Sequence, residues 1–257
     1  MIKFLFRGLL RDRHRSLLPF LVTLIGVMLT VVFHAWMTGV IGNSIEFSAR
    51  FASGHVKVMT RAYSENAAQA PNDLALIGTA TLTAGLPERW PEMEFAERIH
   101  FAGIIDAPDS LGETREQGPA MGFGIDLLSG NTAEAERMNI PSSLRNGRMP
   151  EKKNEVLISA LFADKLNIVP GDVITLVGSS MYGELAMHNF TVSGTVDFCT
   201  TALDRGTVIA DIGDVRDALN MEDAAGEILG FFRTGVYDEE RASAICDEFN
   251  RVYNSPE

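Results

Sequence analysis

The feature that most constrains this chain is an uncharged run near its N-terminus. Every residue from Ser16 to Ile45 lacks a formal charge, and the centre of the run, from Leu17 to Gly42, reads LLPFLVTLIGVMLTVVFHAWMTGVIG. An α-helix rises about 1.5 Å per residue and the hydrocarbon core of a bilayer is about 30 Å thick, so about 20 residues cross it. We therefore expect a transmembrane helix over residues 17–45, with some tilt, and an extramembrane domain after it.

A cleaved signal peptide is the alternative for this segment. Signal peptides have apolar cores of about 7–15 residues and a cleavage site of the Ala-x-Ala kind. The uncharged run is far longer, and the residues from Gly42 to Ile45 lack that pattern. The segment is therefore interpreted as a retained membrane span.

Charges before the span predict its orientation. The basic residues there are Lys3, Arg7, Arg11, Arg13 and Arg15. They are accompanied by one acidic residue, Asp12, and basic residues beside a span are retained in the cytoplasm. We expect the N-terminus inside the cell inner (plasma) membrane and the domain over residues 46–257 outside it, periplasmic or extracellular. Residues 1–16 are expected to form a basic helix in the cytoplasmic interface or a cytoplasmic extension of the span.

The rest of the chain is strongly acidic. The whole sequence has 22 basic and 34 acidic residues, and removing the five basic and one acidic residue of positions 1–16 leaves 17 and 33, a net charge of −16. An acidic ectodomain argues against nucleic acid and against anionic lipid as its ligand. We expect attachment to a membrane through the span and no nucleic-acid partner.

Strand and helix patterns alternate throughout the ectodomain, which predicts an α+β fold. Strands are expected at 54–60, 94–105, 119–125, 154–158, 173–178, 186–197, 206–210 and 227–233, and helices at 74–86, 160–167, 212–219 and 238–254. Residues from about 127 to 225 form a β-rich stretch, which we expect to be a lobe inserted into a second lobe built from the flanking segments. The predicted fold is one transmembrane helix followed by a two-lobed domain.

Four segments carry a resemblance to a known family. They are the basic helix FLFRGLLRDRHRSLL before the span, GHVKVMTRAYSE after it, GIDLLSGN with SLRNGRMPEKKNEVLISALFADKLNIVPGDVITLVG, and TVSGTVDFCTTALDRGTVIADIGDVRDALNM. Gly54, His55 and Tyr63 match the family's "G-H-v-x-v … Y", and the third segment matches its "N-E-V-L-I-s" and "G-D-x-v-x-l". Their order after a first span resembles the N-terminal half of MacB-type permeases, a family that includes MacB, LolC, LolE and, more distantly, FtsX.

The resemblance implies a non-catalytic membrane subunit of an ABC transporter. Its ectodomain would be a porter-like lobe with an inserted β-rich lobe, moved by ATP hydrolysis in the cytoplasm to export or release a lipophilic cargo or a lipoprotein. The implied partners are a cytoplasmic ABC ATPase on a separate chain, a second permease subunit in a homo- or heterodimer, and a periplasmic lipoprotein carrier or adaptor. The alternatives are an FtsX-like regulator that activates an extracytoplasmic enzyme and a membrane-tethered binding domain.

The sequence departs from the family pattern at its end. Family members have three further spans after this domain, and the segment that contacts the ATPase lies between the second and third of them. We therefore expect that this chain is a truncated permease.

No constellation of catalytic or ligand residues is apparent. A Walker A loop is absent, so ATP binding by this chain is not expected. The histidines His55, His100 and His188 lack the spacing of a zinc site, and the acidic residues between 106 and 116 lack that of a calcium loop. We predict no catalytic, cofactor-binding or metal-binding residues and no cofactor.

A few single residues have two interpretations. His34, inside the span, is either a functional group or a neutral side chain bonded to a neighbouring helix. Cys199 and Cys246 are either a periplasmic disulfide or, as the apolar helix face of Cys246 favours, two buried free thiols. Contact points for a partner are expected at the hairpin tip Met181-Tyr182 and at Phe231-Phe232, which alternatively belong to a core strand.

Overall fold

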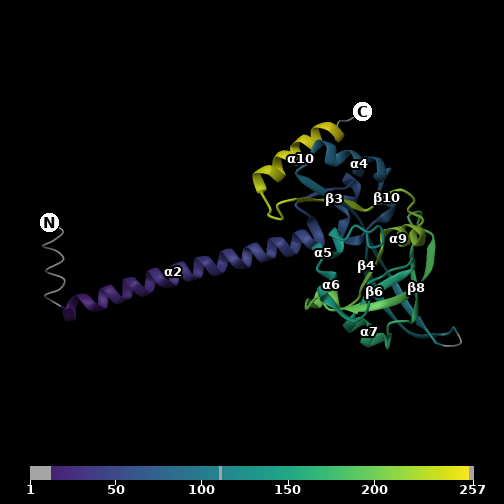
Figure 1. Cartoon of the computed structure of the whole chain (residues 1–257), viewed down its shortest axis with the longest axis horizontal. Coiled ribbons are helices and arrows are strands. Elements are labelled where there is room, and N and C mark those ends of the chain that lie inside the picture. Colours follow the sequence, from purple (N-terminus) through teal and green to yellow (C-terminus); the bar gives the residue numbers. More distant parts are fainter. Residues whose placement is uncertain (1–12, 110–111, 255–257) are drawn as a thin grey trace. The chain divides into compact units, whose positions relative to one another are not determined.

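The first structural unit is a single long helix. The computed structural model describes residues 13–109 and 112–254, and the chain divides into the units Met1–Ala49 and Arg50–Glu257. Helix α2, Arg13–Ser48, contains the whole predicted span of 17–45 (Figure 1). Most of the basic segment 1–16 lies outside the described residues.

Helix α2 has the properties of a membrane span. Its apolar window has a mean hydropathy of 2.3, and none of that window is buried inside the structure. Three threonine hydroxyls, of Thr23, Thr30 and Thr38, donate to the backbone carbonyls four residues before them at 2.8, 2.8 and 2.9 Å. These polar groups are therefore satisfied within the helix itself, which suits an environment without water. In the described part of the chain this is the one helix long and apolar enough to cross a membrane.

The second unit mixes helices and strands, as the sequence predicts. Its helices are α3 (Arg61–Glu65), α4 (Thr79–Arg89), α5 (Ala133–Arg137), α6 (Ile140–Ser143), α7 (Ala160–Leu166), α8 (Thr201–Asp204), α9 (Ile212–Leu219) and α10 (Glu239–Tyr253). Short helical turns are η1 (Ala49–Ser53), η2 (Ala67–Gln69) and η3 (Asn72–Leu74).

Nine of its strands form one hydrogen-bonded sheet. They are β1 (Val56–Val58), β3 (Met93–Pro108), β4 (Thr114–Ile125), β5 (Leu144–Gly147), β6 (Glu155–Ser159), β7 (Val173–Ser179), β8 (Leu185–Val196), β9 (Thr207–Asp211) and β11 (Glu227–Phe232). The order is β1-β11-β3-β4-β9-β6-β8-β5, with β7 paired to both β3 and β8. A separate pair joins β2 (Leu76–Ile77) to β10 (Ala224–Ala225).

The long strand β3 links two parts of this sheet. Its first six residues, Met93 to Arg98, pair antiparallel with β11, whereas Ile99 and the residues after it pair with β4. We call β1, β11 and residues 93–98 the β1 subsheet, and the remaining strands of the sheet the β8 subsheet. Strand β4 pairs with β9 and strand β3 pairs with β7, so residues 99–125 belong to the β8 subsheet together with strands from residues 127–225. The division of the domain into two lobes, with the inserted lobe at about 127–225, stays a proposal.

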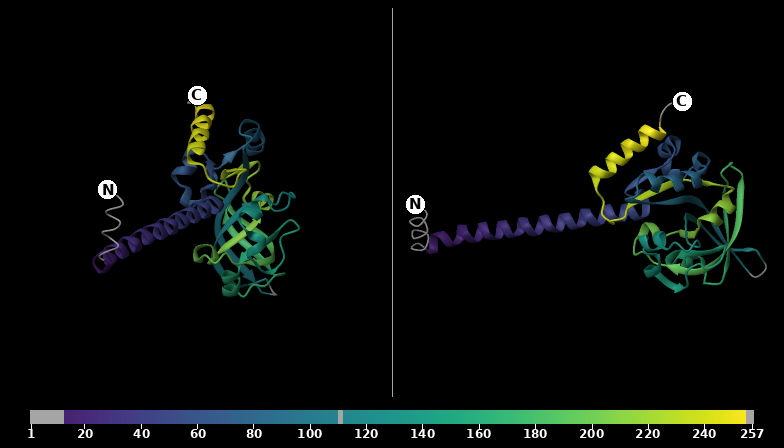
Figure 2. Two further views of the ribbon diagram at one scale, coloured as in Figure 1. Left: turned by 60° about the vertical axis from the view of Figure 1, so that its left-hand side comes forward. Right: turned by 45° about the horizontal axis from the view of Figure 1, so that its top comes forward.

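The β1 subsheet is covered by two helices. Helices α4 and α10 share one apolar core with its strands, which comprises Val56, Val58, Leu86, Trp90, Met93, Ile228, Phe232, Ala242 and Ile245. Helix α10 begins where the Asp238 carboxylate accepts the backbone N–H of Arg241 at 3.0 Å, so this acidic residue caps the helix. Figures 1 and 2 show α4 and α10 together at one end of the domain.

The central strands of the β8 subsheet, β6 and β9, are covered on both faces. On one face, Phe162 and Leu166 of α7 and Val215 and Leu219 of α9 pack against its strands. On the other face, α5 and α6 contribute a second core that contains Ala135, Met138 and Ile140. Strands covered on both faces read as continuous apolar runs, which explains the sequence Val156-Leu157-Ile158.

Several local expectations are corrected. The predicted helix over 74–86 is replaced by strand β2 followed by α4, and α4 continues through Pro87 to Arg89. Pro87 is tolerated because it lies in the last turn, where it removes one hydrogen bond only. Long-range pairing with β10 makes Leu76 and Ile77 a strand, which local pattern cannot reveal.

The two cysteines are free thiols, but only one is partly buried. Cys246 is half-buried on α10, and burial, followed by the charge of Asp247, raises the pKa of its thiol. Cys199 is exposed in the turn before α8, so the expectation that both are buried is wrong for Cys199. In this turn the backbone N–H of Cys199 donates to the Asp197 carboxylate, two residues earlier, at 2.9 Å.

Candidate functional site

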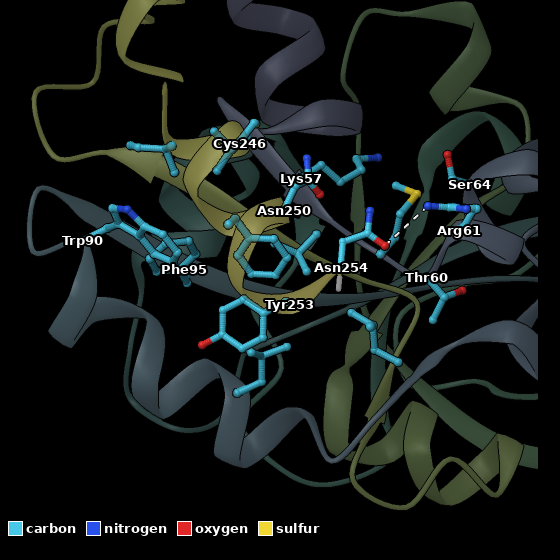
Figure 3. Close-up of a pocket in the computed structure, with 17 residues that line it drawn as sticks. Lys57, Thr60, Arg61, Ser64, Trp90, Phe95, Cys246, Asn250, Tyr253 and Asn254 are labelled. Carbon is cyan, nitrogen blue, oxygen red and sulfur yellow. Dashed lines mark hydrogen bonds between the residues drawn. The ribbon is translucent and has the colours of Figure 1, made fainter. Parts of the chain in front are cut away.

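A groove runs beside strand β1. A cavity of about 510 Å³ is lined by residues 56–61, which comprise β1 and the chain directly after it, and by one stripe of helix α10 (Figure 3). The stripe consists of Ile245, Cys246, Phe249, Asn250, Tyr253 and Asn254. Leu82 of α4 and Phe95 of β3 also line it. We call this cavity the β1 groove.

The wall of the β1 groove on the α10 side is aromatic. The rings of Phe249 and Tyr253 stack with centroids 4.5 Å apart, and Phe249 lies 6.0 Å from the ring of Trp90. Trp90 is buried, and its indole N–H donates to Glu248 Oε2 at 3.2 Å. The inner rings are therefore held by their neighbours, while Tyr253 is half-exposed at the mouth. Such a wall favours contact with apolar side chains or other apolar groups.

The two basic side chains that line the groove, Lys57 and Arg61, are each paired with another residue of the domain. Lys57 Nζ lies 2.6 Å from Glu227 Oε2, and Arg61 donates to Asn254 Oδ1 at 3.4 Å (Figure 3). The groove therefore offers apolar contacts together with the backbone of β1.

Glu227 is a buried carboxylate beneath β1. Its side chain is 2 % exposed and accepts from Lys57, and its Oε1 lies 2.9 Å from His100 Nε2. Burial alone raises the pKa of Glu227, but the hydrogen bond and charge of His100 and the charge of Lys57 bring it below its ordinary value. Nearby, burial and then the charge of Glu227 raise the pKa of Tyr63 to about 12. The cluster joins β1, β3 and β11, so its evident role is structural.

The histidines that the sequence analysis considered are separate. His55 Nδ1 accepts the backbone N–H of Phe232 at 2.9 Å, and His188 Nε2 lies 2.7 Å from Asn154 Oδ1. His34 lies on α2 in the other unit. Within residues 13–109 and 112–254, no three His, Cys, Asp or Glu side chains gather in a group that could hold a metal ion.

A second surface lies on one face of the β8 subsheet. Cross-strand pairing aligns Met187 of β8, Val177 of β7, Ile104 of β3 and Pro119 of β4 in one row. Met187 is 65 % exposed and its neighbour two residues earlier on the same face, Leu185, is 74 % exposed. Apolar rows of this kind, uncovered by any described element, are typical of surfaces that contact a partner.

A second cavity adjoins this surface. It has a volume of about 650 Å³ and is lined by Met121, Leu161, Lys165 and Arg205, among others. Met121 is 62 % exposed. Lys165 and Arg205 place two basic side chains at this cavity, although the chain is acidic as a whole. Sequence reasoning missed this surface, although the alternation of exposed Leu185 and Met187 along β8 is a signal that could have indicated it.

The predicted contact residues behave differently from one another. Tyr182 at the β7–β8 hairpin tip is 75 % exposed, as a contact point requires, whereas Met181 is buried. Phe231 and Phe232 are buried in β11, so the core-strand interpretation is confirmed. Met181 turns inward because its backbone N–H donates to Leu219 O at 2.8 Å, which ties the tip to α9.

Comparison with solved structures finds a similar fold in one periplasmic domain. The chain is similar to the periplasmic region of MacB from Actinobacillus actinomycetemcomitans, with a TM-score of 0.52 over 77% of this chain and 83% of that chain, at 10% sequence identity. No protein-family model matches the sequence, and no curated protein sequence matches it. The resemblance to MacB that the sequence predicts is therefore confirmed in the fold, a mixed α+β domain that follows an apolar N-terminal helix.

Proposed function

We propose that this chain is the N-terminal part of the membrane subunit of a MacB-type ABC transporter. The observation that carries the proposal is the combination of a fold like the periplasmic region of MacB with a preceding helix apolar enough to span a membrane. In this function, helix α2 anchors the domain in the cell inner membrane, with its N-terminus in the cytoplasm and the domain in the periplasm. ATP hydrolysis by a separate cytoplasmic subunit moves the domain.

The cargo class follows from the surfaces that the domain presents. The aromatic wall of the β1 groove and the exposed row around Met187 favour apolar partners, and the net charge of −12 disfavours polyanions. We therefore propose export or release of a lipophilic cargo or a lipoprotein. A second permease subunit and a periplasmic carrier or adaptor complete the proposed assembly.

A purification experiment tests the assembly. The complete protein, tagged and extracted from its own cells in mild detergent, is expected to copurify with an ABC ATPase and to hydrolyse ATP only with it. The 257-residue chain alone is expected to show no ATP hydrolysis. ATP turnover by the chain alone would contradict the proposal.

Depletion of the protein tests the activity. Lipoproteins or lipophilic compounds are expected to accumulate in the inner membrane when the gene is silenced, and quantitative lipid and lipoprotein analysis measures this. Unchanged inner-membrane composition, together with loss of an extracytoplasmic enzyme activity, would instead indicate an FtsX-like regulator. Retention of the wild-type phenotype with no ATPase bound would indicate a tethered binding domain.

A further inference from the structure

The cavity beside Met121 is basic, although the chain is acidic as a whole. It lies where α7 and the end of α8 meet the first residues of β4 and β9, and we call it the α7–α8 cavity. Leu161 and Lys165 lie one turn apart on α7, so this helix presents an apolar and a basic side chain to it. Arg205 supplies a second positive charge, and none of the described residues that line the cavity is acidic.

Both basic side chains are available to a ligand. Within the described part of the chain, neither Lys165 nor Arg205 takes part in an ion pair or a side-chain hydrogen bond, and both are exposed. The carboxylate of Asp204, the residue before Arg205, accepts the backbone N–H groups of Phe198 and Thr200 at 2.9 and 2.8 Å. Asp204 is therefore engaged in its own turn. The basic side chains of the β1 groove, in contrast, are both paired.

The backbone fixes the place of Arg205 beside β4. The backbone N–H of Met121 donates to Gly206 O at 2.9 Å, where β4 and β9 begin to pair. A Cβ atom at Gly206 would lie 2.9 Å from Pro119 O, so this close approach requires glycine. The positive charge of Arg205 is therefore held next to the exposed apolar residues of β4.

The exposed apolar row of the β8 subsheet leads to this cavity. Cross-strand pairs align Met187, Val177, Ile104 and Pro119, one residue on each of four adjacent strands, and Pro119 lines the cavity. The next strand after β4 is β9, which begins two residues after Arg205. Adjacent strands lie about 4.8 Å apart, so the distance from Met187 to the start of β9 is about 19 Å. The surface is thus apolar along its length and basic at one end.

We propose that the α7–α8 cavity and this row bind one single-chain amphiphile with an anionic headgroup, of the fatty-acid class. The carboxylate lies between Lys165 and Arg205, and the acyl chain lies along the row toward Met187. A saturated chain of about sixteen carbons is about as long as the span of about 19 Å estimated from the strand spacing. This inference rests on the proposed function, because it names the chemical class of the cargo.

The net negative charge of the domain does not oppose such a ligand. Charges are screened over about 8 Å at physiological ionic strength, whereas two unpaired cations in contact with a carboxylate act at short range. The same net charge does oppose adsorption to an anionic bilayer, which would bring many negative charges to the surface at once. The arrangement therefore favours a single amphiphile over an anionic membrane surface.

Photo-cross-linking tests the proposal. The 257-residue chain is reconstituted in nanodiscs of phosphatidylcholine and exposed to hexadecanoate that carries a diazirine, and mass spectrometry locates the label. A diazirine next to the carboxylate is expected to label residues 119–121, 161–165 and 202–207, and one at the methyl end to label residues 185–187. The matching diazirine hexadecanol is expected to label the cavity about tenfold less. Equal labelling by the acid and the alcohol would show apolar partitioning only and would overturn the proposal.

Paired substitutions test the role of the two charges. Lys165→Gln with Arg205→Gln is expected to lower cavity labelling by hexadecanoate by about tenfold and to leave labelling by hexadecanol unchanged. The matched control is Arg145→Gln with Lys152→Gln, which removes two exposed basic side chains outside the cavity and changes the net charge equally. Equal effects of the two pairs would assign the labelling to net charge and contradict the site.

Chain length tests the role of the row. Met187→Gln is expected to weaken labelling by hexadecanoate by about threefold, because the far end of the chain loses an apolar contact. Labelling by a diazirine octanoate is expected to stay unchanged, since the shorter chain ends before Met187. Ile77→Gln, a change at a 75 % exposed apolar residue of β2, is the control. Unchanged hexadecanoate labelling in Met187→Gln would contradict a chain that lies along the row.

Three further outcomes separate this inference from others. Label at residues 185–187 that is present in discs with one chain and lost in discs with two would assign the row to an interface between copies and overturn the proposal. Specific labelling in a complete permease that moves no amphiphile would support the site and contradict the proposed transport function. Normal transport by the complete permease without specific labelling would overturn the site and leave the transport function standing.

Discussion

Glu227 shows how one residue can join three strands. It lies on β11, and its carboxylate contacts Lys57 of β1 at 2.6 Å and His100 of β3 at 2.9 Å. A buried carboxylate is stable only where hydrogen bonds and opposite charges replace its hydration. The three strands are therefore coupled to the ionisation of one group.

The first prediction concerns this ionisation. The pKa of Glu227 in the folded chain is lower than its ordinary value of 4.5, so its stabilising contribution is present above that value and is lost as the pH falls through the folded pKa. Glu227→Gln is expected to lower the free energy of unfolding at pH 7 by about 1–3 kcal/mol. It is also expected to flatten the loss of stability between neutral and acidic pH. Urea unfolding in micelles, followed by circular dichroism across pH, measures both.

The control for this prediction is an exposed carboxylate on α4. Glu88→Gln is expected to change the free energy of unfolding by less than about 0.5 kcal/mol at every pH. If Glu227→Gln behaves like Glu88→Gln, the carboxylate does not couple the strands.

The second prediction concerns Gly54, the glycine that precedes β1. Its φ is +59°, and a Cβ atom there would lie 2.8 Å from Val56 O and 3.1 Å from Gly230 O. Gly54→Ala is expected to destabilise the domain by well over about 1 kcal/mol, since it combines backbone strain with a clash. Gly183→Ala is the matched control, because Gly183 has a φ of +79° with no atom within 4 Å. Thermal unfolding compares them, and equal losses of stability would show that the contacts of Gly54 do not matter.

The motif residues that carry the family resemblance organise turns. Asn154 takes a φ of +61°, and the next residue, Glu155, accepts backbone N–H groups from Glu151 and Lys152 at 2.9 and 3.2 Å. The Arg148 guanidinium donates to both oxygens of Glu155, and these bonds hold the pKa of Glu155 at about 2. The motif "N-E-V-L-I-s" thus shapes the loop that leads into β6.

At the scale of elements, the C-terminal end of α2 has the features of a rigid helix. It extends through Ser48, and residues 45–51 contain neither Gly nor Pro. Force reaches a distant site only through an element that does not bend freely. If the proposed function is correct, motion made in the cytoplasm reaches the domain through this helix and through the chain that follows α10.

The third prediction tests this coupling in the complete permease. Insertion of Gly-Gly-Ser-Gly after Phe47 is expected to abolish transport while ATP hydrolysis continues, because a flexible joint dissipates the motion. Folding and membrane insertion are expected to persist, since the insertion leaves the domain core untouched. A four-residue insertion of Ala, which keeps the helix, serves as the control. Normal transport with the Gly-rich insertion would exclude α2 as a mechanical rod.

At the scale of the whole molecule, the membrane orientation is the first quantity to measure. Cys199 is exposed in the domain, whereas Cys246 is half-buried. In intact cells, a membrane-impermeant maleimide is expected to label Cys199. In a variant with Cys199→Ser, Cys246→Ser and Ser16→Cys, labelling is expected only after the membrane is permeabilised. Labelling of position 16 from outside the cell would reverse the proposed orientation.

Some of the candidate site was accessible from sequence and some was not. The exposed hairpin residue Tyr182 was predicted, because a tip between two strands must face solvent. The β1 groove was not, since residues 56–61 and the stripe on α10 are about two hundred positions apart. The row from Met187 to Ile104 was missed for the same reason, because only the register between β3, β7 and β8 aligns it.

The sequence by itself determined those features of the structure that depend on residues close together in the chain. The uncharged run determines a helix, because its length and hydropathy are local properties. Elements begin at local signals too, such as the helix cap at Asp238 and the turn residues around Gly171. Only the tertiary structure decided which strands pair. Helix α4 begins where Asp223, 143 residues away, accepts the backbone N–H of Ala80 at 2.8 Å, and β3 joins two subsheets that no local pattern distinguishes. The physical reason is that a strand satisfies its backbone groups through distant partners, whereas a helix satisfies them within itself.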